Sequence, residues 1–388
     1  MENNTPKLTD REVLTYAREE LKEYLPLSVE AGYKCSTDDL YNLLLKVGVN
    51  QTTLQTACQS LKKVPHPATV RNYLNEQLRV EDLAELENQL NAALAAQVPA
   101  WLRKKPQKIA LDFHDEPYYG KSEQTTGLWV RGPAQDGTTR FYRVATIYVM
   151  ESNMRVTLGI RFVRPEDDHI AVLKFLLRRL RAIQVNVGTL FLDKGFAGIQ
   201  EMRFLHKAGF PAVIACPIRG KKGGTRALCN QTGSYVTNYT FCSGKRSFTA
   251  RLAVCRTFTT SKRTQRSKRK VVWLIYILIH CDYSPERARH QYRRRFGIES
   301  SYRSLGQVLG KTTSSNPAYR FVLLALGFFL LNVWRHFCYL YTQVPRRGGR
   351  FLDPALFQLS RLVQFVNQAL DDVYGHLDEI AAPVAPIT

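Results

Sequence analysis

The order of extended and helical segments between residues 109 and 218 constrains the fold more than any other feature of the sequence. Runs rich in β-branched and aromatic residues predict strands, and runs with apolar residues at helical spacing predict helices. In chain order, the segments are three strands, a helix, a strand, a helix and a strand, at 109–114, 141–150, 155–163, 165–183, 187–192, 198–208 and 211–218. The first three strands suit antiparallel hairpins, and the helices suit crossovers between parallel strands. One mixed sheet of five strands, covered by helices, is therefore expected.

Mixed five-stranded sheets with this order form the ribonuclease-H-like core, an α/β fold. The predicted order is interrupted at about 219–282, where Thr, Ser, Gly and β-branched residues are frequent and an apolar strand follows at 271–279. This interruption predicts a β-rich insertion. We expect an all-α domain over 1–100, the ribonuclease-H-like domain over 101–343 and a C-terminal helical segment over 344–388.

The first 100 residues carry periodic leucines and several helix-start signals. Short helices are predicted at 36–45, 50–61 and 67–74, which suggests a helix-turn-helix. Arg71 would then stand near the start of the third helix, where a recognition helix contacts bases or phosphates. The alternative is a plain helical bundle that serves packing or dimerisation.

The run at 321–334 is apolar but spans only 14 residues. A membrane span needs about 20 apolar residues, so a buried core helix and no membrane partner are expected. The eight cysteines include no CxxC pair, and the first residues are too polar for a secretory signal. Reduced thiols in a cytoplasm are expected rather than a zinc site.

A strongly basic balance points to nucleic acid as the partner. The chain has 55 Lys and Arg against 33 Asp and Glu, a net charge of +22, and the basic residues are spread along most of its length. The segment 261–270 holds six basic residues, Lys268 and Arg269 among them. Such a run is often a solvated loop, but in a chain this basic it equally suits phosphate contacts.

Three acids could converge on one site. Asp112 interrupts an apolar strand, IALDF, and Asp193 directly follows the apolar strand that ends at residue 192. Adjacent parallel strands place residues at their carboxyl ends side by side. A helix over 291–305 would carry the third acid, Glu299, on one face with Tyr292, Arg295 and Arg303. Three such carboxylates could hold two Mg²⁺ ions about 4 Å apart for phosphodiester chemistry.

Other assignments of these acids stay open. Asp115 or Glu116, in the stretch DFHDEPYYG, could replace Asp112, since predicted strand ends are uncertain. Asp193 could merely cap the following turn. His114 shares a strand face with Asp112, but a lone histidine is more often structural.

At these residues the sequence resembles the DDE transposases of prokaryotic insertion sequences, in the branch named for its YREK signature. The resemblance rests on IALDFHDEPYYG, TLFLDKGFAG and YRRRFGIESSYR, and it covers roughly residues 108–334. Tyr292, Arg295 and Glu299 match the spacing Y-x2-R-x3-E. The signature's lysine is absent, because position 306 is glycine, and Arg303 or Lys311 could supply the missing cation.

The resemblance implies that Asp112, Asp193 and Glu299 bind two Mg²⁺ ions, for which Mn²⁺ can substitute. It implies that Tyr292 and Arg295 contact phosphates near the scissile bond or orient the glutamate. It further implies cleavage at terminal inverted repeats, joining to target DNA, action as a homodimer, and a prokaryotic, cytoplasmic and nucleoid-associated location. A nuclease or resolvase of the same fold, and a non-catalytic DNA-binding protein derived from a transposase, are the alternatives.

Overall fold

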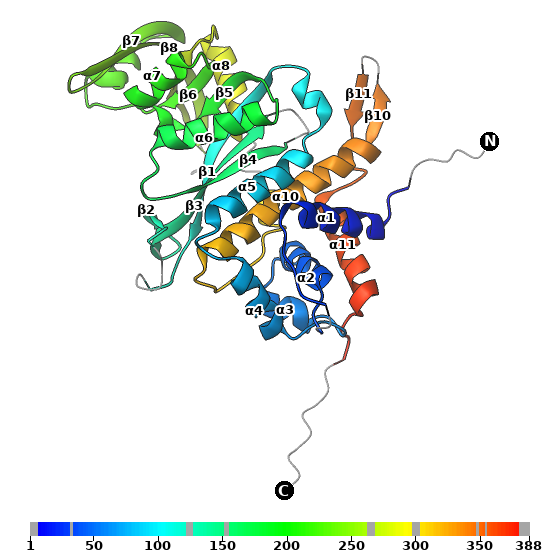
Figure 1. Ribbon diagram of the computed structural model, residues 1–388. Helices are drawn as coiled ribbons and strands as arrows, with labels where there is room; N and C mark the ends of the chain where they lie inside the picture. The colour runs from blue at the N-terminus through cyan, green and yellow to red at the C-terminus, as the bar shows by residue number, and fades with distance from the viewer. Residues whose placement is uncertain are drawn as a thin grey trace. The chain divides into compact units, whose positions relative to one another are not determined.

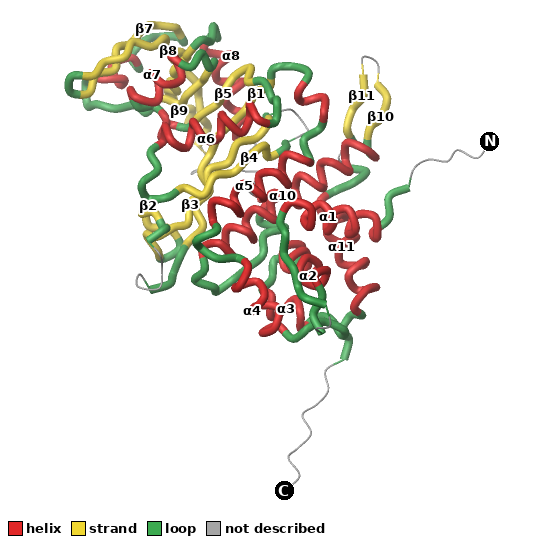
Figure 2. Tube along the Cα trace, in the orientation of Figure 1, coloured by secondary structure: helices red, strands yellow, loops and turns green. Residues whose placement is uncertain are grey.

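The computed structural model describes residues 7–31, 34–121, 127–150, 155–261, 268–296, 303–346, 349–353 and 355–379. The chain divides into two compact units. The sheet unit comprises residues 99–118 and 129–301, and the helical unit comprises residues 1–98, 119–128 and 302–388. Figure 1 labels the helices and strands of both units, and Figure 2 colours the chain by secondary structure.

The sheet unit is built on one mixed sheet, which contains nine strands in the part of the chain that is described. Their bounds are β1 (Gln107–Pro117), β2 (Val130–Gln135), β3 (Thr138–Val149), β4 (Thr157–Val163), β5 (Val187–Leu192), β6 (Ala212–Cys216), β7 (Tyr235–Ser243), β8 (Arg246–Ser261) and β9 (Lys268–Ile279). Their order is β2-β3-β1-β5-β6-β9-β8-β7, and β4 also pairs with β3. Only β1–β5 and β5–β6 are parallel among these pairs.

The segments predicted as strands all appear, but the sheet is wider than the five strands expected. The predicted insertion supplies β7, β8 and β9, and β9 pairs antiparallel with β6, so the insertion continues the sheet. On the other side, β2 pairs with β3. The apolar, β-branched composition of β9 explains this extension, because such a strand is stable when both of its neighbours pair with it.

Helices pack on this sheet and connect its strands. They are α6 (His169–Ala182), α7 (Ile199–Lys207) and α8 (Pro285–Arg293), and α8 runs into a 3-10 turn, η5 (Arg294–Phe296). Helix α6 packs on β4, and α8 packs on β8 and β9. The Asp168 carboxylate accepts a bond from the Ala171 amide at 2.7 Å, so α6 begins at residue 169 and not at 165 as predicted.

The helical unit is organised around the long helix α10. Its helices are α1 (Asp10–Tyr24), α2 (Thr37–Val49), α3 (Leu54–Gln59), α4 (Pro67–Gln77), α5 (Leu83–Ala96), α10 (Pro317–Tyr341) and α11 (Leu359–Tyr374), and a hairpin of β10 (Gln343–Arg346) and β11 (Gly349–Leu352) follows α10. Helices α2, α5 and α11 all contact α10. In Figure 1, α5 and α10 run side by side.

Helix α10 contains the apolar run predicted to be a core helix. Among the described residues it is the one helix long and apolar enough to cross a membrane, and 89% of its most apolar window is buried inside the protein. Helices α2, α5 and α11 pack against it, and its residues belong to the helical unit. Helix α10 therefore lies in the helical unit, whereas the sequence-based boundaries placed it with the sheet.

The connection between α3 and α4 differs from the tight turn expected of a helix-turn-helix. It runs from residue 60 to residue 66, seven residues, whereas such turns usually have about three or four. Backbone bonds of 2.9 Å tie Lys62 to Gly375 and Lys63 to Tyr374, at the end of α11. The predicted helix over 354–369 is α11, displaced toward the C-terminus, and it packs on α1 and α2.

Candidate active site

Two of the predicted acids lie just beyond the paired stretch of two neighbouring parallel strands, Asp112 within β1 and Asp193 after the end of β5. Strand β1 pairs with β5, with Ala110 opposite Phe191. Asp112 follows Ala110 by two residues, and Asp193 follows Phe191 by two residues. The two acids therefore occupy equivalent positions beyond the last residues that pair. Burial raises the pKa of Asp112, Arg295 opposes this effect, and the charge of Asp193 adds to it. The structure therefore brings these two carboxylates together.

Arg295 is buried against the first of these acids. Its Nη2 donates to Asp112 Oδ1 at 2.9 Å and to the Leu111 carbonyl oxygen at 3.3 Å, and the residue is only 8% exposed. Its own carbonyl accepts a bond from the Tyr148 hydroxyl at 3.5 Å. A planar guanidinium group can make these bonds to a carboxylate and a carbonyl at once, so Arg295 is bound to β1 at Leu111 and Asp112.

Tyr292 makes the corresponding contact with the second strand. Its hydroxyl donates to the Leu192 carbonyl at 3.1 Å, at the last residue of β5, and accepts from Arg295 Nη1 at 3.4 Å. Burial raises the pKa of Tyr292 to about 12, so the phenol remains protonated. Tyr292 and Arg295 together hold α8 and η5 against the end of β5 and the place in β1 where its pairing with β5 ends. We call this arrangement the strand-end clamp.

The clamp corrects part of the sequence prediction. A single helix was expected over 291–305, but α8 ends at Arg293 and a 3-10 turn follows. Tyr292 and Arg295 nevertheless lie together, because residues three apart share a face in both kinds of helix. Glu299 falls within 297–302, outside the described residues.

Asp193 also caps the turn that follows it. Its Oδ1 accepts a bond from the Gly195 amide at 2.9 Å, at the start of η3 (Lys194–Phe196). A Cβ atom at position 195 would lie 3.0 Å from the same oxygen, so glycine keeps this approach open. The capping role considered as an alternative for Asp193 is thus present. It holds the carboxylate in place at the end of β5.

The alternative acid Asp115 is bound on the other side of β1. Its two oxygens accept bonds from Arg143 at 2.6 and 2.7 Å. Since successive side chains of a strand point to opposite faces, Asp115 and Asp112 do not share a face. Arg143 fully engages the Asp115 carboxylate, which favours Asp112 as the partner of Asp193.

A second pair beside Asp193 was not identified from the sequence. His169 Nδ1 lies 3.6 Å from Glu201 Oε1, and both residues stand in the first turns of helices, α6 and α7. The Glu201 carboxylate raises the pKa of His169, and Asp193 adds to this, while His169 lowers the pKa of Glu201. Helix starts that follow strands gather at one sheet edge, and this pattern could have pointed to both residues.

The remaining predicted residues fall into three groups. Burial lowers the pKa of His114 to about 4, so it is neutral near pH 7, as expected of a structural histidine. Arg71, Arg303 and Lys311 are exposed in the helical unit. Lys268 and Arg269 begin β9, and their side chains are outside the description.

No described group of three or more His, Cys, Asp or Glu side chains forms a metal-binding cluster. Within the sheet unit, the described part of the site is therefore a pair of carboxylates beside a buried guanidinium group. Carboxylate oxygens at the carboxyl ends of parallel strands suit a hard divalent cation.

Comparison with known proteins gives a fold. No protein-family model and no curated protein sequence matches the chain. Its structure is similar to the cryo-EM structure of a piggyBac transposase synaptic complex with hairpin DNA. The TM-score is 0.54 at 9% sequence identity, and the match covers 94% of this chain and 77% of that one. The fold of this chain therefore resembles that of the piggyBac transposase.

Proposed function

We propose that this protein is a metal-dependent DNA transposase of the DDE type. The observation that carries the proposal is the pair Asp112 and Asp193, which follow the last paired positions of the parallel strands β1 and β5 under the strand-end clamp. The similarity of the fold to that of the piggyBac transposase supports it. Glu299 would be the third acid.

The sheet topology supports a ribonuclease-H-like core. Strands β4, β3 and β1 pair antiparallel, and β1, β5 and β6 pair parallel, which gives the order β4-β3-β1-β5-β6. Helix α6 connects β4 to β5, and α7 connects β5 to β6. This order supports the five-stranded core that the sequence predicted, with β7 to β9 as the insertion.

The clamp supports a positioning role for Tyr292 and Arg295. Both residues are buried and bonded to strand ends, which favours orientation of the acids over direct phosphate contact. Glu299 follows Arg295 by four residues, and four residues of chain span at most about 14 Å. With Arg295 held against Asp112, a chain of this length would allow Glu299 to join the first two acids.

The side chains present fit a divalent metal site. Two carboxylates close together repel each other, and burial disfavours the charged form of Asp112, so a bound cation would relieve both costs. Asp112, Asp193 and Glu299 would hold Mg²⁺, or Mn²⁺ in its place, and Arg295 would keep Asp112 oriented. Two such ions can activate a water or a 3′-hydroxyl and stabilise the leaving oxygen of a phosphodiester.

The substrate we propose is double-stranded DNA, both the terminal inverted repeats of an insertion sequence and the target. The net charge of +22 supports a polyanionic partner. Synapsis of two ends would require a homodimer. The YREK spacing of Tyr292, Arg295 and Glu299 supports the insertion-sequence branch, and a nucleoid location would follow.

Incubation of the purified protein with DNA tests this function. The DNA fragment should carry the terminal repeats that flank the gene, and Mg²⁺ should yield both end cleavage and strand-transfer products. Cleavage without joining would instead identify a nuclease. Binding without cleavage in Mg²⁺ or Mn²⁺ would identify a DNA-binding protein that has lost its chemistry.

A further inference from the structure

A second polar site lies in the helical unit, between α3, α4 and the segment before α10. It is a pocket of about 280 Å³. Its lining residues are Thr53, Leu54, Gln55, Arg71, Leu74, Asn75, Thr313, Ser314 and Tyr319. All but the two leucines carry hydroxyl, amide or guanidinium groups. We call it the Arg71 pocket.

The chemistry of the Arg71 pocket suits an anion. Among the described residues that line it, Arg71 is the one charged residue, and none carries a carboxylate. Arg71 Nη2 donates to Gln55 Oε1 at 3.3 Å, a long bond to a neutral group that leaves the charge uncompensated. Tyr319 is 7% exposed, and its hydroxyl has no hydrogen-bond partner among the described residues. Unmet donors beside an uncompensated cation match a ligand that only accepts hydrogen bonds.

The wall formed by residues 313 and 314 is held rigidly. Arg320 Nε donates to the Ser314 carbonyl at 2.6 Å, and its Nη2 donates to the Thr312 carbonyl at 3.3 Å. The Lys311 amide donates to the Thr52 carbonyl at 2.9 Å, which joins this segment to the start of α3. The pocket is therefore preorganised, and the exposed Lys311 lies at its border.

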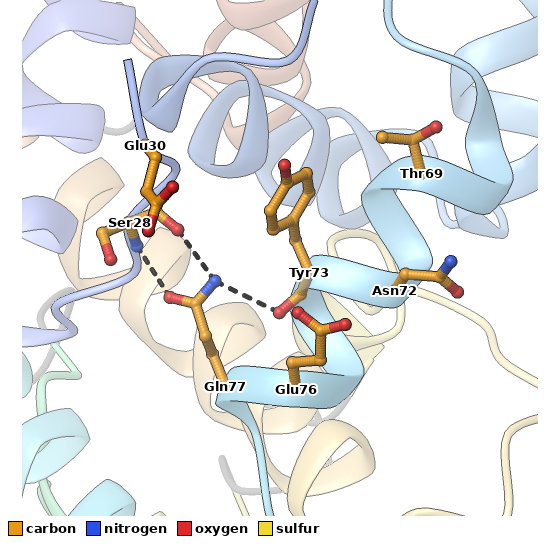
Figure 3. A pocket seen from close by; sticks show the side chains of 7 residues that line it. All are labelled: Ser28, Glu30, Thr69, Asn72, Tyr73, Glu76 and Gln77. Atoms are coloured by element: carbon orange, nitrogen blue, oxygen red, sulfur yellow. Dashed lines mark hydrogen bonds between the residues drawn. The ribbon is translucent and has the colours of Figure 1, made fainter. Parts of the chain in front are cut away.

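The opposite flank of α4 has the reverse character. A pocket there is lined by Ser28, Glu30, Thr69, Asn72, Tyr73, Glu76 and Gln77 (Figure 3). It contains two carboxylates and no lysine or arginine among its lining residues. Gln77 closes one side, because its amide bonds to Ser28 and to the Tyr73 carbonyl (Figure 3). The two carboxylates disfavour phosphate on this flank. The two flanks of α4 therefore differ in charge, with Arg71 on one and the carboxylates on the other.

We propose that the Arg71 pocket binds a phosphate group of the DNA backbone. The inference rests on the proposed function in one respect, that DNA is the substrate. Arg71 and Lys311 were predicted as separate DNA contacts in different domains, and the fold brings their segments together. Arg71 and the hydroxyl groups of the pocket would bind one phosphate. This contact would determine which flank of α4 faces the DNA.

A matched pair of substitutions on α4 tests the pocket. Asn75→Asp adds a carboxylate inside the Arg71 pocket, whereas Thr69→Asp adds the same charge on the opposite flank. Both residues are exposed, so both variants should fold. With a fluorescent 30-base-pair duplex of mixed sequence, we expect Asn75→Asp to weaken binding at least about tenfold and Thr69→Asp distinctly less. Equal losses would overturn the assignment.

Substitution of the cation gives an independent reading. Arg71→Gln should raise the dissociation constant for the duplex about tenfold and reduce the slope of its logarithm against log salt by about one. Arg11→Gln, an equal charge change at an exposed position of α1, should do neither. A wild-type slope in the Arg71→Gln protein would contradict the proposal.

Titration with inorganic phosphate separates the two sources of this ligand. If calorimetry shows phosphate binding that Arg71→Gln abolishes, while duplex affinity is unchanged, the pocket serves free phosphate and the DNA assignment is wrong. All of these measurements read binding. A wild-type protein that binds DNA without cutting it would therefore overturn the proposed catalysis and leave this inference standing.

Discussion

Asp193→Asn and Asp112→Asn proteins are each expected to cleave DNA ends at least about a thousandfold more slowly than the wild type. Amide oxygens are neutral and bind divalent cations far more weakly than carboxylates, and a catalytic cation contributes several kcal/mol to the stabilisation of charge. Single-turnover cleavage of a labelled end fragment in Mg²⁺ measures the rates. Duplex binding should change little, because the phosphate contacts are made elsewhere.

Asp282→Asn is the matched control for this experiment. It removes one exposed carboxylate from the same unit, where Asp282 pairs with Arg251 at 2.7 Å. Its cleavage rate should stay within about twofold of the wild-type rate. If Asp112→Asn cuts normally and Asp115→Asn does not, the first acid is Asp115 and our assignment fails.

Arg295→Met should lower the free energy of unfolding by about 3 kcal/mol. The substitution keeps an unbranched but shorter side chain and leaves Asp112 without the guanidinium group that lies 2.9 Å from it, in a site where burial already disfavours its charge. It also removes the bond to the Leu111 carbonyl. Urea denaturation followed by circular dichroism measures the change.

A double-mutant cycle separates the ion pair from simple packing. Asp112→Asn in the Arg295→Met background removes the uncompensated charge, so the double variant should regain about 1–2 kcal/mol relative to Arg295→Met alone. Should the two losses simply add, Arg295 would stabilise the fold through packing, and the clamp would have no electrostatic role.

Strands and helices with strong local signals could be predicted from the sequence. The strand at 187–192 was predicted with its observed bounds, because an apolar run there ends at a charged residue. The start of α6 was missed by four residues, because two acids and a proline precede the true cap at Asp168. Local composition predicts that a helix or strand forms, whereas a single capping hydrogen bond decides the residue at which it begins or ends.

Contacts between residues far apart in the sequence could not be predicted from local composition. The apolar run in α10 predicts burial, but the helices that bury it are set by tertiary packing, so its unit was assigned wrongly from the sequence alone. The pairing of Arg295 with Asp112 joins residues 183 positions apart and depends on how α8 settles on the strand ends. Sequence spacing gave a shared face for Tyr292 and Arg295, but not the buried carbonyls they bind.

Divalent-cation binding by the whole protein is the most direct measurement of the central claim. Calorimetric titration with Mn²⁺ should show binding by the wild type and at least a tenfold loss in Asp112→Asn, Asp193→Asn and Glu299→Gln. Because burial raises the pKa of Asp112, protons should compete at a higher pH than for an ordinary aspartate, and affinity should fall as the pH is lowered through that raised value. Wild-type affinity for Mn²⁺ in the Asp193→Asn protein would contradict the account.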